Sequence, residues 1–218
     1  MLKYLSFDVG IKNLAYCIVN DTNKIEDWVI INLNEDPICD VHLRKKCDKQ
    51  STYSVSGDKF VNFCCTAHSK KFKKKKKLNT SRDLFNISKI CINKIRELDL
   101  KDIDFVLIEN QPALKNPIMK SIQMIIYTFF MIEGVMNEES NIQKIHMVNA
   151  RNKLKVYKGP KIECNKKNKY AQNKYLSIEY TKKMIHEDTA EFQELFRESK
   201  KKDDLADAYL QAIYWIEK

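Results

Sequence analysis

The chain has 218 residues, and its 39 Lys and Arg against 29 Asp and Glu give a formal net charge of +10. Hydrophobic residues make up 44% of the sequence, which is enough to bury a core and excludes wholesale disorder. Glycine is scarce, with only 4 residues and none near another. This scarcity excludes a Rossmann dinucleotide fingerprint and a P-loop, because each needs clustered glycines.

The sequence carries no signal for export or membrane insertion that we recognise. Asp8 falls where a signal peptide needs an apolar stretch, and the longest apolar run, 124–132, is too short to cross a bilayer. We therefore expect an intracellular protein with no membrane partner. The 7 cysteines are an odd number in such a chain, so metal binding or plain burial is favoured over a disulfide framework.

The positive charge is concentrated in one segment. Residues 39–80 contain twelve Lys and Arg and three Asp, a net charge of +9, which leaves about +1 for the rest of the chain. A basic appendage on a neutral body indicates a polyanionic partner, most commonly nucleic acid. A solubilising lysine loop is the alternative interpretation.

The first half of the chain predicts strands, an insertion and a helix. Apolar alternation and turn residues predict antiparallel strands at 2–9, 14–20 and 25–33. Residues 34–80 show no sustained period and hold most of the Cys and His, so we interpret them as an insertion. Ser81 is the predicted N-cap of a helix whose apolar residues continue to Leu98.

The second half alternates strands with helices. The nearly continuous apolar run at 103–109 predicts a strand buried on both faces. The other predicted elements are a helix that is apolar almost all round, a further strand and two final helices joined by a polar connection: 118–136, 142–148, 169–185 and 203–216.

This order of elements predicts an α/β protein with an RNase H-like fold. Such a fold has a mixed five-stranded sheet flanked by helices, and here a Cys/His-rich insertion follows the third strand. We expect one domain of this RNase H-like fold over 1–218, interrupted at 34–80 by the basic insertion.

Acidic residues lie where three distant segments should meet. Asp8 and Glu109 end predicted parallel strands, so both should emerge at one edge of the sheet. Asp204 and Asp207 are three apart on the last helix and share a face. Asp203 is an alternative ligand to Asp204, or the N-cap of that helix. Gathered carboxylates repel one another unless cations neutralise them, so the set predicts a Mg²⁺ site, with Mn²⁺ as a substitute.

The motifs FDVGIKNLAYCIV, VLIENQP and KKDDLADAYLQA together resemble the RuvC-like Holliday junction resolvases, in particular the branch of poxviruses and related large DNA viruses. The resemblance spans nearly the whole chain. It implies that Asp8, Glu109, Asp204 and Asp207 bind catalytic Mg²⁺. It also implies a homodimer that nicks two opposed strands of a four-way junction, at the site of viral DNA replication.

The resemblance also implies contacts with DNA. Gln111 and the start of the following helix, with Lys115, Asn116 and Lys120, would lie near the DNA backbone. Arg151 or Lys153 would contact the scissile phosphate. For all of these, ordinary solvated surface is the alternative.

The insertion predicts two further sites. Cys65 and His68 have C-x₂-H spacing and, with Cys39 and Cys47, predict a Cys₃His structural zinc site. His42 in place of Cys47 and Cys64 in place of Cys65 are alternative ligands, and reduced cysteines without metal remain a further alternative. The run 70–77, including Lys73, Lys74 and Lys75, predicts a phosphate clamp on one arm of the junction; a nuclear-localisation signal is the competing interpretation.

The predicted function is thus a Mg²⁺-dependent endodeoxyribonuclease that resolves branched DNA. Two alternatives stay open, because substrate choice depends on dimer geometry and basic surfaces. One is a nuclease of the same fold acting on RNA–DNA hybrids or flaps. The other is a non-catalytic, zinc-bearing DNA-binding module. An actin-like phosphotransferase is disfavoured, because it needs glycine-rich phosphate loops that this chain lacks.

Overall fold

The protein was analysed as a computed structural model, which describes residues 1–34, 37–42, 45–78, 83–114 and 116–218. The chain divides into two compact units, which we describe separately. Met1–Leu33 and Asn86–Lys218 form the larger unit, and Asn34–Phe85 form the smaller one.

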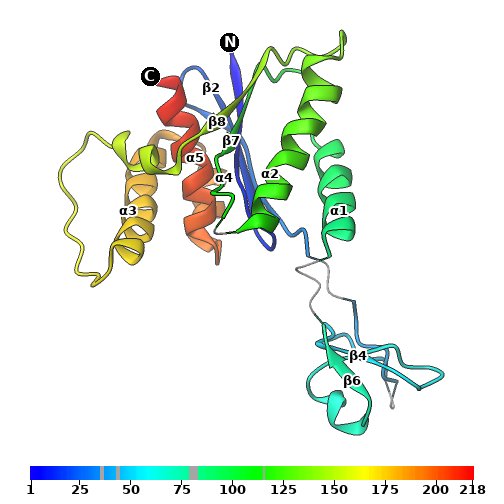
Figure 1. The fold of residues 1–218 in the computed structure, drawn as a ribbon. Coiled ribbons are helices and arrows are strands. Elements are labelled where there is room, and N and C mark those ends of the chain that lie inside the picture. The colour runs from blue at the N-terminus through cyan, green and yellow to red at the C-terminus, as the bar shows by residue number, and fades with distance from the viewer. Residues whose placement is uncertain (35–36, 43–44, 79–82, 115) are drawn as a thin grey trace. The chain divides into compact units, whose positions relative to one another are not determined.

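A five-stranded mixed sheet forms the centre of the larger unit (Figure 1). Strand β2 pairs antiparallel with both β1 and β3, while β7 is parallel to β1 and β8 is parallel to β7. The order across the sheet is β3 (Ile25–Ile31), β2 (Leu14–Asn20), β1 (Lys3–Asp8), β7 (Phe105–Glu109) and β8 (Lys144–Val148). The predicted five strands and their mixed directions are confirmed.

Helices cover both faces of this sheet, because strand residues alternate between two cores. Leu14, Tyr16 and Ile18 of β2 face one core, which contains apolar residues of α1 (Leu84–Arg96) and α2 (Pro117–Phe130). Ala15, Cys17 and Val19 face the other core, built with α4 (Ala190–Glu198) and α5 (Lys202–Ile216). Helix α3 (Lys169–Met184) packs against α5. The predicted N-cap of α1, Ser81, lies outside the described residues.

The apolar helix predicted at 118–136 is α2 continued by a π-helical turn, Met131–Val135. Pro117–Val135 is long and apolar enough to span a membrane by length and composition alone. Ile122, Ile126 and Phe130 are nonetheless fully buried in the first core. This helix therefore packs on the sheet, as its pattern predicted, and leaves Met124 and Ile132 exposed.

Helix α4 was not predicted from the sequence, where we expected a polar connection. Phe196 is its one buried residue, and it stacks on Trp28 of β3 with ring centroids 5.1 Å apart. The partly buried Phe192 and Leu195 lie on the same face. Only three apolar residues with helical spacing lie in this charged segment. Such a short pattern does not predict a stable helix, and the packing of Phe196 on Trp28 supplies the missing stabilisation.

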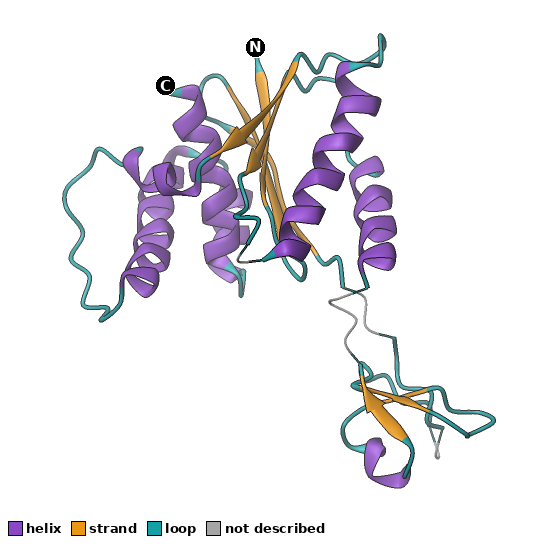
Figure 2. Cartoon of the chain, in the orientation of Figure 1, coloured by secondary structure: helices purple, strands orange, loops and turns teal. Residues whose placement is uncertain are grey.

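The smaller unit contains regular structure that the sequence pattern did not indicate (Figure 2). Its antiparallel sheet has the order β5 (Phe63–Cys64), β4 (Tyr53–Val55), β6 (Lys75–Lys77). A 3₁₀ helix, η1, spans His68–Lys71. Three lysines of the predicted basic run thus form an edge strand with all side chains exposed. The core is small and consists mainly of Cys39, Val41, Cys64 and Cys65.

Candidate functional site

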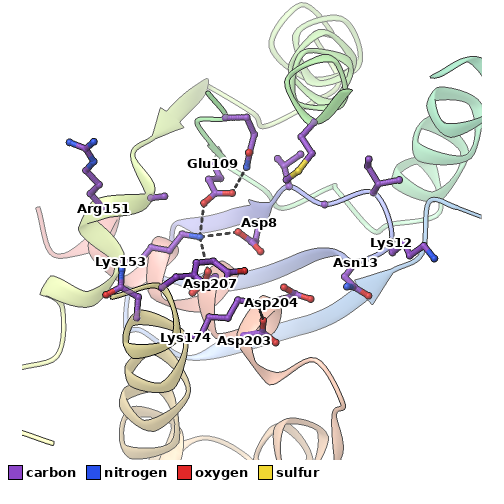
Figure 3. Close-up of a pocket in the computed structure, with 18 of the residues that line it drawn as sticks. Asp8, Lys12, Asn13, Glu109, Arg151, Lys153, Lys174, Asp203, Asp204 and Asp207 are labelled. Carbon is purple, nitrogen blue, oxygen red and sulfur yellow. Dashed lines mark hydrogen bonds and ion pairs between the residues drawn. The ribbon is translucent and has the colours of Figure 1, made fainter. Parts of the chain in front are cut away.

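Acidic side chains from three distant elements converge in one pocket at the edge of the central sheet (Figure 3). Phe7 of β1 pairs with Ile108 of β7, so Asp8 and Glu109 end neighbouring parallel strands at the same level. Asp204 and Asp207, on the first turns of α5, line the same pocket. The structure therefore brings together the four acids that we singled out.

Helix α5 is held against the sheet by buried polar contacts as well as by its apolar face. The amide nitrogen of Gln211 donates to Ser6 Oγ and to the carbonyl of Phe7, each at 3.1 Å. Gln211 is completely buried and lies one turn beyond Asp207. Trp28 Nε1 donates to the carbonyl of Leu205 at 3.0 Å. These contacts fix the direction in which α5 presents its acids.

The turn after Asp8 also has a steric requirement. A Cβ on Gly10 would lie 2.4 Å from the carbonyl oxygen of Asn13. A larger residue would push the β1–β2 loop, and with it the pocket wall formed by Lys12 and Asn13. Glycine is therefore needed for the close approach of the backbone rather than for an unusual φ angle.

The pocket disfavours negative charge in the absence of a cation. Burial, with the charge of Glu109 adding to it, raises the pKa of Asp8 to about 7. Burial and the neighbouring carboxylates raise the pKa of Asp204 to about 6. Asp204 Oδ2 is buried and has no hydrogen-bond partner in the described structure. An orphaned oxygen beside three other carboxyl groups fits a divalent cation, and an all-oxygen donor set favours Mg²⁺ or Mn²⁺.

The adjacent acids Asp203 and Asp204 have different surroundings. Lys174 of α3 forms a close ion pair with Asp203. Burial acts to raise the pKa of Asp203, but the hydrogen bond and charge of Lys174 outweigh it and lower that pKa. Asp203 is thus already neutralised by a lysine, whereas Asp204 is not. This difference favours Asp204 as the metal ligand.

Lys153 lies inside the carboxylate cluster and not at its surface. It is on the 3₁₀ helix η4 (Ala150–Lys155), and its side chain is only 4% exposed. Its Nζ is 2.9 Å from Asp8 Oδ1, 2.9 Å from Glu109 Oε1 and 3.3 Å from Asp207 Oδ2. Arg151, at the start of η4, is exposed and lines the pocket.

The other residues expected near DNA differ in burial and in their contacts. Gln111 is buried in the pocket wall, where its amide donates to Glu109 and its backbone N–H donates to Gln123 Oε1 at 2.8 Å. Lys120 Nζ is 3.2 Å from Asn110 Oδ1. Asn116 is the N-cap of α2. Lys115 lies outside the described residues.

A second basic region, which we did not predict, connects η4 to α3, two elements that contribute residues to the pocket. Within 158–169 the only acid is Glu163, and all five lysines are exposed. In the described part of the chain only Lys158 of these five forms an ion pair, with Glu217. We call them the lysine strip: Lys158, Lys161, Lys166, Lys167 and Lys169. Acidic residues elsewhere in the larger unit cancel the charge of these lysines, so the nearly neutral net charge outside 39–80 did not indicate a basic region here.

Tyr170 follows the strip directly at the start of α3. This residue is 71% exposed, and it lines the pocket together with Asn173 and Lys174. The sequence signal for this surface was the combination of spaced lysines with an aromatic residue just before a helical period. This pattern is present in the sequence, but only the structure shows that Tyr170 lines the same pocket as the acids.

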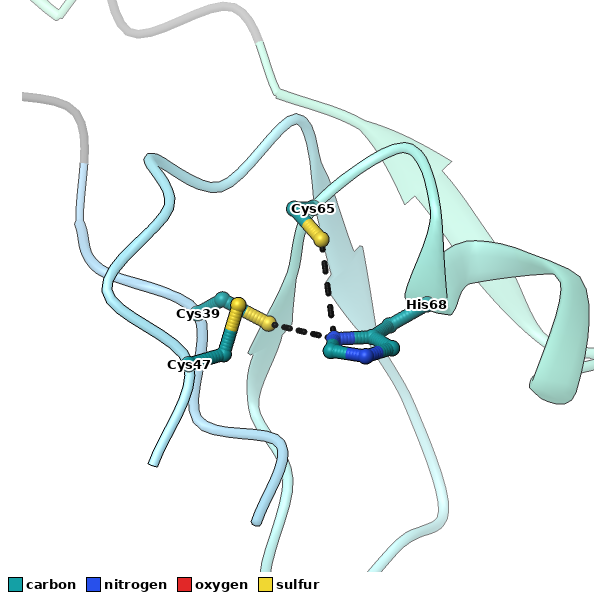
Figure 4. A group of neighbouring side chains, drawn as sticks. All are labelled: Cys39, Cys47, Cys65 and His68. Atoms are coloured by element: carbon teal, nitrogen blue, oxygen red, sulfur yellow. Dashed lines mark hydrogen bonds between the residues drawn. The ribbon is translucent and has the colours of Figure 1, made fainter. Parts of the chain in front are cut away.

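In the smaller unit, Cys39, Cys47, Cys65 and His68 form one cluster (Figure 4). Their ligand atoms all lie within 4.8 Å of one another. Cys39 Sγ is 3.4 Å and Cys65 Sγ is 3.5 Å from His68 Nδ1. A tetrahedral zinc site places its ligand atoms about 3.5–3.8 Å apart, so the cluster fits zinc.

The alternative ligands stay outside this cluster. His42 and Cys64 are not among the grouped side chains, and Cys64 is completely buried in the small core. Burial acts to raise the pKa of the Cys65 thiol, but the backbone N–H of His68 and the neighbouring thiols outweigh it and lower that pKa. The environment of Cys65 thus favours its thiolate form, which binds metal. A backbone hydrogen bond acts to lower the pKa of the Cys47 thiol, whereas burial and the neighbouring thiols outweigh it and raise that pKa.

Comparisons with known proteins agree with this fold. No family model matches the chain. Uncharacterized protein L451 of Acanthamoeba polyphaga mimivirus is 34% identical over 195 residues; the match covers 78% of this chain and 46% of that protein. The chain thus spans less than half the length of this relative.

The likeness to solved structures covers nearly the whole chain at lower sequence identity. The yeast mitochondrial Holliday junction resolvase Ydc2 has 18% identity and a TM-score of 0.54, over 99% of this chain and 79% of that one. The fowlpox virus resolvase, in a complex with Holliday junction DNA, has 19% identity and a TM-score of 0.54, over 99% and 97%. The chain therefore has the RNase H-like fold found in Holliday junction resolvases.

Proposed function

We propose that this chain is a divalent-metal-dependent endonuclease that resolves four-way DNA junctions. One observation carries the proposal: Asp8, Glu109, Asp204 and Asp207 meet in one pocket of a chain with the resolvase fold. The likeness to a mimivirus protein and to the fowlpox resolvase supports a viral enzyme that acts where viral DNA is replicated.

The four acids would hold Mg²⁺ or Mn²⁺, which supplies Lewis-acid activation of the phosphodiester and a bound water of lowered pKa. The protein's own residues prepare this site. Gln111 orients Glu109, and Gln211 anchors the helix that carries Asp207. Lys174 neutralises Asp203, so Asp204 is the acid left for the metal.

DNA binding requires cations around this acidic centre, because phosphates and carboxylates repel each other. Arg151 supplies positive charge at the pocket, and the lysine strip supplies it on the segment that leads into α3. The exposed ring of Tyr170 provides a surface on which an unstacked base can stack. Gln111, at the pocket, and Lys120, on α2, remain proposed contacts, as does Lys115, which lies outside the described residues. Lys73, Lys74 and Lys75 remain proposed contacts of the smaller unit.

The smaller unit would depend on a structural zinc ion. Its core holds few apolar side chains, and its sheet has strands of only two or three residues. A unit of this size needs a disulfide or a bound metal ion to stabilise it in addition to its core. Cys39, Cys47, Cys65 and His68 would bind such an ion.

Paired nicks on opposed strands require two copies of the active site. We therefore propose a homodimer, which a symmetric four-way substrate matches by its own two-fold symmetry. The exposed apolar residues Met124 and Ile132 on the outer face of the long helix are candidates for this contact.

The test is cleavage of a labelled four-way junction beside linear duplex, flap and RNA–DNA hybrid, with Mg²⁺ or with EDTA. Asp204→Asn is the inactive variant, and Glu198→Gln, an exposed acid on α4, is the matched control. Symmetric nicks in the junction alone, lost with EDTA and Asp204→Asn only, support the proposal. Preferred cutting of the hybrid or the flap would mean that this nucleic acid, and not the four-way junction, is the substrate. Tight binding of the junction without cutting would favour a non-catalytic DNA-binding module.

A further inference from the structure

A single ammonium group occupies the centre of the carboxylate cluster. Lys153 has three N–H donors, and three different carboxylates lie within 3.3 Å of its Nζ, from Asp8, Glu109 and Asp207. Nζ donates hydrogen bonds to Asp8 Oδ1 and Glu109 Oε1 and forms an ion pair with Asp207. Its burial distinguishes Lys153 from the lysines of the strip, which are all exposed.

The same oxygen atoms cannot serve an ammonium and a divalent cation at once. Mg²⁺ needs its oxygen ligands at about 2.0–2.1 Å, whereas Lys153 Nζ lies 2.9 Å from both Asp8 Oδ1 and Glu109 Oε1. A metal ion held by this pair of oxygens would lie within the space that Nζ fills, and two cations in one small site repel each other.

We propose that Lys153 is a built-in counter-ion that holds the carboxylates together before a divalent cation binds and leaves them when one does. This inference rests on the proposed metal site. Lys153 keeps the acids gathered in the metal-free protein, which would otherwise contain several buried, unpaired carboxylates. It also competes with the metal, so it lowers the apparent affinity.

When a divalent cation displaces it from the acids, the Lys153 ammonium becomes available to bind phosphate. Lys153 remains tethered to η4, two residues from the exposed Arg151 at the pocket. Once it is released from the acids, its charge is available to the phosphate of a bound strand. Metal binding and phosphate binding are then coupled through one side chain, so each favours the other.

The first test uses the unmodified protein without DNA. A lysine-acylating reagent is applied with and without Ca²⁺ or Mg²⁺, and modification is measured for each lysine by mass spectrometry. We expect Lys153 to be protected without metal and to become several-fold more reactive with it, while exposed Lys155 on the same helix is modified equally in both. Unchanged protection of Lys153, with metal binding shown by a thermal shift, would overturn the inference alone.

The second test compares Lys153→Met with the matched control Lys155→Met by calorimetric titration with Mn²⁺. Loss of the competing ammonium should lower the Kd of Lys153→Met by about tenfold or more, while Lys155→Met behaves as wild type. Equal or weaker binding by folded Lys153→Met overturns the inference. Lys153→Gln replaces it if the methionine variant does not fold. If no form binds metal and none cleaves DNA, the proposed function falls too and Lys153 is a permanent ion-pair partner.

Discussion

Gln211 both packs in the core and anchors α5, the helix that carries Asp204 and Asp207 of the pocket. Its replacement by Met should keep the packing and remove the anchoring hydrogen bonds. The change preserves length and volume but removes the amide donor, which makes hydrogen bonds of 3.1 Å to Ser6 Oγ and to the Phe7 carbonyl. Two net hydrogen bonds are worth about 1–3 kcal/mol together. Gln211 Oε1 is buried without a partner in the described structure, and its removal recovers part of this loss.

We therefore expect Gln211→Met to lower the free energy of unfolding by only about 0–2 kcal/mol. Cleavage should fall further, on the order of ten- to a hundredfold, because Asp207 lies one turn away and small displacements of a catalytic group are costly. The measurements are urea unfolding and the initial rate of junction cleavage at saturating Mg²⁺.

Ile213→Val is the matched control for this prediction. Ile213 is buried on the same helix, and the change lowers stability by about 0.5–1.5 kcal/mol without touching the anchor. The reasoning is refuted if Gln211→Met loses no more cleavage activity than Ile213→Val. It is also refuted if Gln211→Met loses more than about 4 kcal/mol, since the amide would then be a major element of the core.

Four further predictions follow from the same contacts. The purified chain should contain one zinc ion by elemental analysis, which Cys47→Ser removes and Cys64→Ser keeps; equal loss from both variants would contradict the ligand set. Phe196→Ala should lower the free energy of unfolding by about 3–5 kcal/mol, and a loss below about 1 kcal/mol would mean that α4 is not docked. Burial raises the pKa of Asp8 from 3.8 to about 7, so the native state holds a proton that the unfolded chain has released. In EDTA, stability should thus fall as the pH rises through this interval, and Mg²⁺ should reverse the trend in urea titrations. Lys167→Ala should reduce the slope of log affinity for the junction against log salt by about 0.9, the value for one lost phosphate contact. An unchanged slope would exclude this lysine from the interface.

Local patterns were sufficient for most of the fold. The strand-forming and turn residues that mark β1–β3 and the continuous apolar run of β7 are properties of consecutive residues. Because parallel neighbours end at one edge, the pattern also placed Asp8 and Glu109 side by side before any coordinates were known. The C-x₂-H spacing indicated a metal cluster by the same local logic.

Other features depended on contacts between distant residues. Helix α4 requires the face of Trp28, and the difference between Asp203 and Asp204 requires Lys174 from another helix. The lysine strip was hidden by charge averaging, since net charge carries no position. The position of Lys153 among three acids also depends on tertiary contacts, and the expected contact of Arg151 or Lys153 with the scissile phosphate stays a prediction.

The sequence by itself thus determined the order of the strands and of most helices in the larger unit and the residue types at the strand ends, because periodicity and turn chemistry are local. Only the tertiary structure decided which cation faces which carboxylate. An ion pair depends on distances of a few ångströms between segments more than a hundred residues apart, such as Lys153 and Asp8, and no local pattern contains such a distance.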